Sequence, residues 1–332
     1  DVAVIIGGRN VGGNYFDNSQ NINFSDTDVL FIGQIATESV HSFDEYWSYH
    51  LAIPVSEFPD QNNPDMLASH DQAIVDTLLS REDILDAYTQ KVESFISAYQ
   101  KKQYQFLWGK GRIIADPPEK MAGEMKADNP MMNALSELWD ASEGSIYISS
   151  AYLVPGEDAN ENIIKSTERG LAVYMLTNSL SSTDSKVVYG GWAKYRDKLL
   201  ASGVKVYEFR NEGYKVKSTL SSGASLHSKV LVFDERITWV GSFNFDPRSA
   251  AYNTETVAVF DCPEFADIIK KSIQDDMSED KSWEVYLDEN GKTWWRTVRG
   301  SEEIIVDHSP DTSLGMRFLM GFLSYIIPDS FL

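Results

Sequence analysis

The residues best suited to chemistry lie in one short stretch, HSKVLVFDERITWVGSFN, which runs from His227 to Asn244. His227 and Lys229 stand two positions apart on an apolar run with the alternation of a strand, which predicts that both side chains point to one face. An imidazole beside a fixed ammonium suits attack on a phosphodiester, because the transition state spreads negative charge over the phosphoryl oxygens. The stretch therefore predicts phosphoryl-transfer chemistry.

The spacing of these residues is that of the HKD motif, and the sequence here resembles the phospholipase D superfamily. Asp234, Gly241 and Asn244 stand at the offsets that the motif requires. Members of that superfamily carry the motif twice and build one site from two halves. The resemblance implies an α/β fold class, a two-domain phospholipase D-like α/β/α sandwich in which the first domain is incomplete.

The first residues of the chain repeat the end of this motif, since VAVIIGGRN at 2–10 parallels ITWVGSFN at 237–244. Asp234 precedes Gly241 by seven positions, so the aspartate equivalent to it before Gly7 falls one position ahead of residue 1. We expect a chain truncated at its N-terminus, without the first His and Lys. A glycine loop for nucleotides is a weaker alternative, because no Gly-Lys-Ser/Thr follows.

Strands alternating with helices after residue 130 predict a layered α/β domain with a largely parallel sheet core. We expect residues 1–125 to be the remainder of the first domain and residues 126–332 to be the complete second domain. The motif predicts strands at 226–233 and 237–241, and the serine-rich residues 215–223 predict a mobile loop just before them.

Composition excludes several classes of function. The 332 residues carry a formal net charge of −21, which disfavours non-specific binding to nucleic acid because the phosphates would be repelled. Cys262 is the only cysteine, so the chain forms no intrachain disulfide.

No segment reaches the roughly 20 apolar residues that a spanning helix needs. An apolar helix is expected at 313–328, either buried on the domain or lying in a membrane interface through Phe318, Phe322 and Tyr325.

The family resemblance implies a role for each motif residue. The upstream histidine would be the nucleophile that forms a phosphohistidine, and His227 would be the general acid and base. Lys229, Asn244 and Asn10 would bind the non-bridging phosphate oxygens, while Ser242 is either a turn residue or a further phosphate donor. No cofactor and no metal are implied.

A catalytic imidazole also needs a carboxylate to hold its tautomer. Asp26 and Glu255 occupy corresponding places after the two Gly-x-x-Asn turns, and in related enzymes each acid reaches the histidine of the opposite half. Asp26 would then orient His227, with Asp28 as an alternative, and Glu255 would orient the missing histidine. Asp234 counts among the catalytic candidates as a motif member, but its place beyond the lysine favours a structural role with local backbone amides.

Further stretches resemble the bacterial cardiolipin synthase branch, particularly its C type. They are GGRNVGGNYFD at 7–17, SSAYLVP at 149–155, LTNSL at 176–180, GGWAKYRDKLL at 190–200 and GSFNFDPRSAAYNTE at 241–255. That branch transfers a phosphatidyl group onto phosphatidylglycerol, with phosphatidylethanolamine or phosphatidylglycerol as donor. The resemblance implies phospholipid substrates, a membrane surface as partner and a peripheral place on the bacterial inner membrane, on a side that the sequence leaves open. The alternatives are a phospholipase D-type hydrolase and an inactive lipid-binding fragment that lacks the N-terminal segment of its own chain.

Overall fold

The computed structural model describes residues 3–16, 19, 22–54, 57, 72, 75–76, 82–101, 103–123, 129–211, 223–326 and 328. Contacts divide the chain into one unit of Asp1–Glu45 with Gly109–Leu332, and a second unit of Tyr46–Trp108, which holds α3 (Glu82–Gln100). The expected domain boundary at residue 125 stays a prediction. The loop predicted at 215–223 lies outside the described residues, apart from Gly223.

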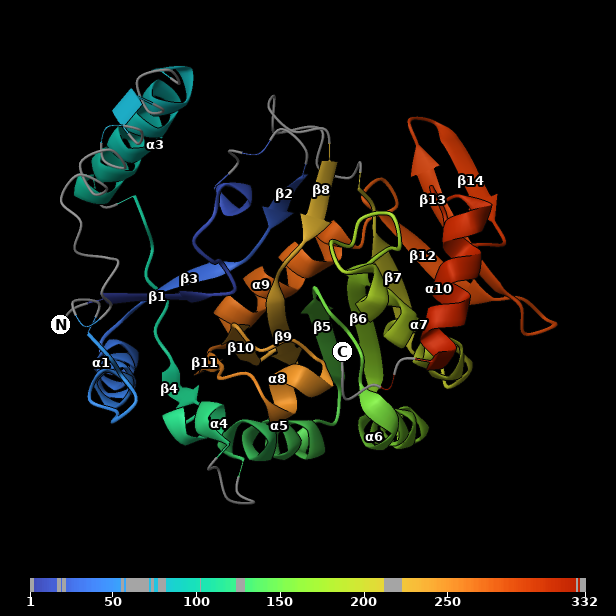
Figure 1. Ribbon diagram of the computed structural model, residues 1–332, viewed down its shortest axis with the longest axis horizontal. Helices are drawn as coiled ribbons and strands as arrows, with labels where there is room; N and C mark the ends of the chain where they lie inside the picture. The colour runs from blue at the N-terminus through green and yellow to red at the C-terminus, as the bar shows by residue number, and fades with distance from the viewer. Residues whose placement is uncertain are drawn as a thin grey trace. The chain divides into compact units, whose positions relative to one another are not determined.

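A ten-stranded mixed sheet forms the framework of the larger unit, in the order β14-β13-β12-β7-β6-β5-β9-β10-β11-β4 (Figure 1). Its strands are β4 (Lys110–Ala115), β5 (Ser145–Ser150), β6 (Ala172–Asn178), β7 (Lys205–Phe209), β9 (Lys229–Phe233), β10 (Ile237–Gly241), β11 (Thr256–Asp261), β12 (Ser282–Leu287), β13 (Thr293–Arg299) and β14 (Glu302–Val306). Among the described strands of this sheet, only β5–β6 and β6–β7 pair in parallel.

The prediction of a largely parallel sheet was therefore wrong. Parallel neighbours need a crossover, and helices supply one only between β5, β6 and β7. The three residues Asp234–Arg236 separate β9 from β10, so these strands can only form an antiparallel hairpin. The segment 278–312, for which the sequence predicted no strand, adds β12, β13 and β14 in antiparallel order to one edge.

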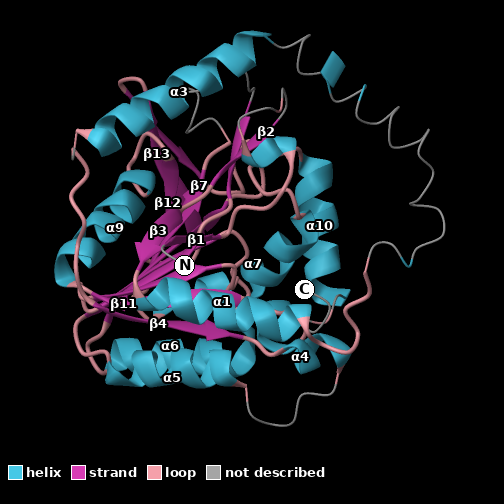
Figure 2. Ribbon diagram, turned by 90° about the vertical axis from the view of Figure 1, so that its left-hand side faces the viewer, coloured by secondary structure: helices cyan, strands magenta, loops and turns pink. Residues whose placement is uncertain are grey.

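Helices cover both faces of this sheet (Figures 1 and 2). They are α4 (Pro118–Ala122), α5 (Pro130–Ala141), α6 (Gly156–Glu168), α7 (Lys186–Ala201), α8 (Pro247–Ala251), α9 (Pro263–Asp276) and α10 (Leu314–Ile326). Ile146 and Ile148 are fully buried in the core that α5, α6 and α7 share, whereas Tyr147 between them faces α9 and accepts a hydrogen bond from Gln274. The alternation of β5 thus separates two apolar layers, and the mixed α/β fold is confirmed.

Two small sheets lie beside this framework. β1 (Ala3–Gly7) pairs antiparallel with β3 (Asp28–Ile32), and β2 (Ile22–Ser25) pairs in parallel with β8 (Gly223–Leu226). β3 ends at Ile32, because α1 (Gln34–Trp47) begins directly after Gly33. The short 3-10 helix η1 (Gly13–Tyr15) leads from the first turn toward β2.

The internal repeat that the sequence predicted has a counterpart in strand register. Gly7 of β1 pairs with Asp28, and Gly241 of β10 pairs with Val257 of β11. The acid two positions before the partner is Asp26 in the first case and Glu255 in the second. A Cβ on either glycine would come within 2.1 Å of an atom of the facing strand, so both places require glycine. The two turns therefore share one local design.

The apolar C-terminal helix, α10, has one buried and one exposed face. Met320 is buried, and Met316 packs against the core beside it. Leu314, Phe318 and Phe322 lie at four-residue spacing on the exposed side, with 78%, 80% and 57% of their surface accessible. The packed face agrees with the buried interpretation, and contact of the exposed face with a membrane stays a prediction. The side chain of Tyr325 lies outside the described residues.

Candidate functional site

The pairing of β2 with β8 places a carboxylate against His227. The parallel ladder ends with Ser25 opposite Leu226, and the amide of His227 then donates to the carbonyl of Ser25 at 2.7 Å. The next side chain on the first strand is Asp26, whose Oδ2 lies 2.7 Å from Nδ1 of His227. The carboxylate is fully buried and the imidazole is 12% exposed. The short β2–β8 ladder thus brings together Asp26 and His227, which lie 201 positions apart in the sequence.

This contact fixes the useful tautomer of the imidazole. A carboxylate only accepts, so Nδ1 of His227 carries the proton that is donated to Asp26, and Nε2 is left to exchange protons. Nε2 lies 3.4 Å from the hydroxyl of Tyr15. Burial, with the charges of Asp184 and Asp26, raises the pKa of Tyr15, so this phenol stays a donor at neutral pH. The rings of Tyr15 and Phe24 each lie 5.0 Å from the imidazole and support its position.

Lys229 lies against the same imidazole. Its Nζ is 3.0 Å from Nδ1 and 3.1 Å from Nε2 of His227, and the residue is 3% exposed. Burial lowers the pKa of Lys229 to about 8, although the carboxylates of Asp26 and Glu255 oppose that shift. An ammonium that is buried this deeply, with a pKa close to neutral pH, is suited to bind an anion.

The strand predicted at 226–233 is interrupted at His227 and Ser228. β8 ends at Leu226 and β9 begins at Lys229, and the two strands belong to different sheets. The carbonyl of Ser228 accepts from the amide of Ala151, and its hydroxyl lies 3.2 Å from that of Thr27. His227 therefore stands at a junction between two sheets. The prediction of one strand was wrong, but the expected proximity of the imidazole and ammonium holds.

Asn178, which the sequence analysis did not single out, fastens the segment just before His227. Its Oδ1 accepts from the amide of Leu226 at 2.8 Å, and its Nδ2 donates to the carbonyl of the same residue at 2.8 Å. The same Oδ1 accepts from the hydroxyl of Ser182 at 3.0 Å. A signal was present, because Asn178 stands in the LTNSL stretch noted above.

The first Gly-x-x-Asn turn packs closely on this centre. A Cβ on Gly8 would lie 2.7 Å from Cδ of Lys229 and 2.9 Å from Oδ1 of Asp26. Asp28, the alternative partner for His227, instead forms an ion pair with Arg9 at 2.5 Å. Asn10 is exposed, and its side-chain oxygen accepts from the amide of Val11. The structure therefore brings the Gly8 turn to the site and leaves the Asn10 side chain turned toward the surface.

Glu255 lies in the corresponding place of the second turn. It is 6% exposed, its Oε1 accepts from Oγ of Ser249 at 2.8 Å, and its amide donates to Asp116 at 3.0 Å. Asp116 is also paired at 2.6 Å with the fully buried ammonium of Lys120. Burial raises the pKa of Glu255, while hydrogen bonds from Ser242 and two other side chains oppose that shift. This buried pair, which the sequence analysis missed, fixes the start of β11.

Asn244 and Ser242 follow Gly241. Among the described residues, the buried Oδ1 of Asn244 has no hydrogen-bond partner, a state that usually marks a group whose partner is a ligand or water. The hydroxyl of Ser242 accepts from the amide of Thr256 at 3.0 Å, which is the geometry of a turn residue. Burial raises the pKa of the next acid, Asp246, to about 6, and this carboxylate accepts from the amide of Ser249 at the start of α8.

Asp234 lies at the other end of β9 from Lys229, roughly 16 Å away at about 3.3 Å per residue. Its carboxylate accepts from the amides of Glu143, Gly144 and Ser145 at 3.0, 2.7 and 3.0 Å. These contacts tie the β9–β10 turn to the start of β5. They support the structural interpretation of this motif aspartate, and Asp234 does not join the group around His227.

Replacing Lys229 with methionine is expected to raise the free energy of unfolding by about 3 kcal/mol at pH 7, because burial disfavours the ammonium. The folded-state pKa of about 8 lies below the unfolded value, so the penalty is complete below pH 8 and disappears as the pH rises toward 10.5. Urea unfolding at pH 7 and pH 10 should give a large difference between the two proteins at pH 7 and a small one at pH 10. Equal differences at both pH values would contradict this account.

Comparisons with known proteins agree with this geometry. The family described as "Cardiolipin synthase, PLD-like domain" matches residues 135–277. Cardiolipin synthase C of Escherichia coli is 32% identical over 98% of this chain and 70% of its own length. An uncharacterised protein of Helicobacter pylori strain J99 is 39% identical over 98% of this chain, which spans 64% of that relative's length.

A solved structure shares the fold. The phosphatidylserine synthase of Haemophilus influenzae superposes with a TM-score of 0.56 at 12% identity, over 98% of this chain and 66% of that protein. At that identity the likeness concerns architecture alone.

Proposed function

This chain belongs to the cardiolipin synthase family of phospholipase D-like proteins, and from that premise we propose that it moves a phosphatidyl group onto the headgroup hydroxyl of phosphatidylglycerol. The observation that supports this most is the contact at 2.7 Å between Asp26 and His227, which joins the two motif halves beside the ammonium of Lys229. An oriented imidazole next to a buried cation can move a proton while a phosphoryl group is held.

The reaction would proceed in two displacements. A second imidazole, which we place in a motif upstream of Asp1, attacks phosphorus as the bond to the leaving alcohol breaks, and His227 protonates that alcohol through Nε2. In the second step the acceptor hydroxyl attacks phosphorus, its proton passes to His227, and the phosphorus–nitrogen bond breaks. One phosphate ester is exchanged for another, and the imidazole ends in its starting state.

The remaining side chains would hold the phosphate and the second imidazole. Lys229 and Asn244 are proposed to contact the non-bridging oxygens, and Glu255 to orient the upstream histidine as Asp26 orients His227. The contact of Asn244 with phosphate would be made by its amide nitrogen, which donates, because the buried Oδ1, which has no partner among the described residues, only accepts. Asn10 and Ser242 remain proposed phosphate contacts, although each side chain is engaged with a backbone amide.

The products from vesicles test the proposal. The chain extended upstream to include the expected HxK pair is incubated with phosphatidylglycerol, and the lipids are identified by mass spectrometry. Transfer gives cardiolipin, because the acceptor alcohol must reach phosphorus before water does. Phosphatidic acid instead would identify a phospholipase D-type hydrolase. If no phosphatidylglycerol is consumed and neither product forms, phosphodiester chemistry is contradicted. The unextended chain, for which little turnover is expected, serves as the control.

We also propose that the exposed face of α10 contacts the membrane surface. Among the described residues, no helix is long and apolar enough to cross a bilayer. The accessible side chains of Leu314, Phe318 and Phe322 could instead lie among the lipid headgroups and upper acyl chains. This placement is peripheral, on the inner membrane of a bacterium as the family membership suggests.

Changing Phe318 and Phe322 together to serine is expected to weaken binding to phosphatidylglycerol vesicles by on the order of tenfold or more, because two large apolar side chains no longer leave water. Co-sedimentation with vesicles measures the effect. A double change at two exposed positions of β14, Glu302 and Glu303 to aspartate, keeps the net charge and is the matched control. Unchanged sedimentation of the phenylalanine variant would place membrane contact elsewhere.

A further inference from the structure

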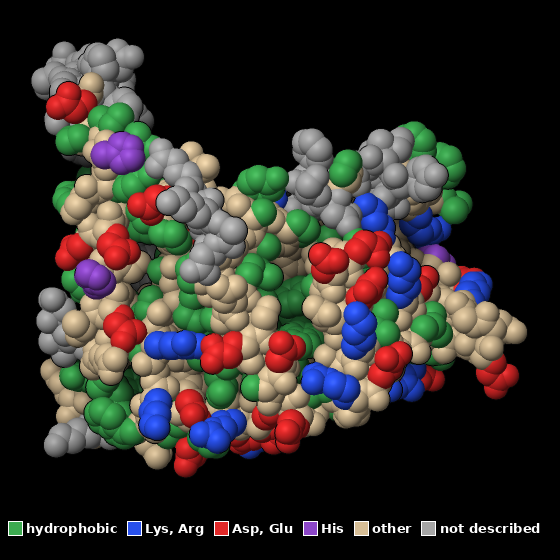
Figure 3. Space-filling view, turned by 90° about the horizontal axis from the view of Figure 1, so that it is seen from below, with side chains coloured by type: hydrophobic (Ala, Val, Ile, Leu, Met, Phe, Trp, Pro, Cys, Tyr) green, Lys and Arg blue, Asp and Glu red, His purple; other side chains and the backbone are tan. Residues whose placement is uncertain are grey.

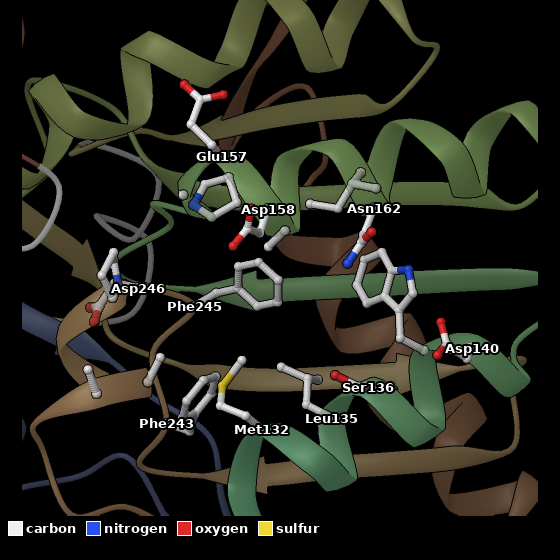
Figure 4. Close-up of a pocket in the computed structure, with 18 residues that line it drawn as sticks. Met132, Leu135, Ser136, Asp140, Glu157, Asp158, Asn162, Phe243, Phe245 and Asp246 are labelled. Carbon is white, nitrogen blue, oxygen red and sulfur yellow. The ribbon is translucent and has the colours of Figure 1, made fainter. Parts of the chain in front are cut away.

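A cavity of about 500 Å³ lies beside the phosphate-binding turn (Figure 4). α5 forms one wall with Met132 and Leu135, and the segment from Pro155 into α6 forms the facing wall. Phe243 and Phe245 line it from the turn that follows Gly241. Its size is in the range of sites that enclose small molecules.

The interior and the rim of this cavity differ in character. Apolar side chains from α5, α6 and the turn meet inside it, whereas Asp140, Glu157 and Asp158 stand exposed at the edge. The face seen from below has apolar side chains in a hollow near its centre and acidic side chains around it (Figure 3). Three carboxylates disfavour an anionic ligand at the rim, so the interior suits an uncharged hydrocarbon.

The cavity and the proposed phosphate site share one short segment. Phe243 and Phe245 point into the cavity, and Asn244 between them carries the buried oxygen without a partner. Asp246 lines the cavity and also acts on the pKa of Lys229. The segment is fixed on its other side, because the amide of Phe245 donates to Ser150 at 3.1 Å. Only the backbone of residues 243–245 thus lies between the cavity and a ligand bound at Asn244 and Lys229.

We propose that this cavity binds one acyl chain of the phospholipid whose phosphate lies at Lys229 and Asn244, an inference that rests on the proposed function. The hydrocarbon leaves water as it enters between α5 and α6, and each methylene that enters strengthens binding by up to about fourfold. The cavity would thus select donor lipids by chain length and would orient the phosphate at the imidazole. It is formed by side chains that touch no reacting atom.

The dependence of binding on chain length tests the inference. Monomeric dihexanoyl, diheptanoyl and dioctanoyl phosphatidylglycerol are titrated into the protein by calorimetry. The affinity of the wild-type protein is expected to rise several-fold with each added methylene per chain. Ala159, which lines the cavity on α6, is changed to tryptophan to fill it, and the series should then be flat. Glu161→Trp is the matched control, since Glu161 is on the same helix with its side chain 64% exposed.

A second measurement guards against a variant that does not fold. Phosphatidylglycerol with a diazirine near the end of one acyl chain is photolysed with the wild-type protein, and the labelled peptides are identified. Label is expected on residues 130–141 and 155–163, which face the cavity. Absence of label there, or a chain-length series that Ala159→Trp leaves intact, would overturn the inference. Chain-length dependence without cardiolipin or phosphatidic acid formation would refute the proposed function while the cavity assignment stands.

Discussion

Replacing Asp26 with asparagine is expected to lower turnover by on the order of 10³–10⁴-fold with little change in folding. Asp26 Oδ2 now accepts the Nδ1 proton of His227 at 2.7 Å and leaves Nε2 free for exchange. The amide nitrogen of asparagine can donate to Nδ1 in its place, which moves the proton to Nε2 and produces the wrong tautomer. The imidazolium that donates its proton to the leaving alcohol, and that forms again when His227 takes the proton of the acceptor, also loses its counter-charge.

Asp28→Asn is the matched control for this change. Asp28 is two positions away and is paired with Arg9, and its side chain is 20% exposed. We expect that variant to keep turnover within a fewfold of the wild type. Steady-state rates of the upstream-extended chain on phosphatidylglycerol vesicles measure both variants. If Asp28→Asn were the more damaging change, the assignment of Asp26 would be wrong.

Replacing His227 with asparagine is expected to remove transfer more completely, by about 10⁴-fold, the upper end for a general acid and base. The reason is that His227 acts in both displacements, first as the acid for the leaving alcohol and then as the base for the acceptor. Thermal unfolding should change little, because the imidazole is partly accessible and its backbone amide still donates to Ser25.

His308→Asn is the control for the loss of an imidazole. His308 is exposed and lies beside Asp307 on the loop after β14. Its replacement is expected to leave the rate unchanged. Equal losses from the two replacements would mean that the effect arises from stability and not from proton transfer.

The family resemblance implied the pairing of Asp26 with His227, with Asp28 as an alternative, and the repeat placed Asp26 and Glu255 at corresponding positions after the two turns. The identical registers of Gly7 with Asp28 and of Gly241 with Val257 are the structural form of that repeat. Sequence spacing alone could not separate Asp26 from Asp28, since both follow β2 closely. Arg9 decides between them by pairing with Asp28.

The break at His227 could not be predicted from periodicity. Residues 226–233 contain no glycine or proline that would mark an interruption, although the strand changes sheets at His227. The side chains that hold this junction, Asn178 and Tyr15, come from distant parts of the chain. Their roles depend on tertiary contacts, which local pattern does not encode.

The direction of the sheet was mispredicted for a related reason. Helix–strand alternation is typical of parallel sheets, and it holds for β5, β6 and β7. After the motif the chain instead uses short connections, and the segment at 282–306 forms three strands. This segment is rich in aromatic and β-branched residues and has Asn290-Gly291 at a turn, a hairpin signal that the sequence analysis missed.

The most direct test of the central claim, that His227 held by Asp26 transfers the proton, uses a leaving group that needs no protonation. The His227→Asn variant of the upstream-extended chain is mixed with the p-nitrophenyl ester of phosphatidic acid, and its intact mass is measured. We predict a burst of one nitrophenol per chain and a stable phosphatidyl adduct on the upstream histidine, because the first displacement proceeds and the second lacks its base. Continued turnover without an adduct, or no reaction at all with this ester, would contradict the account.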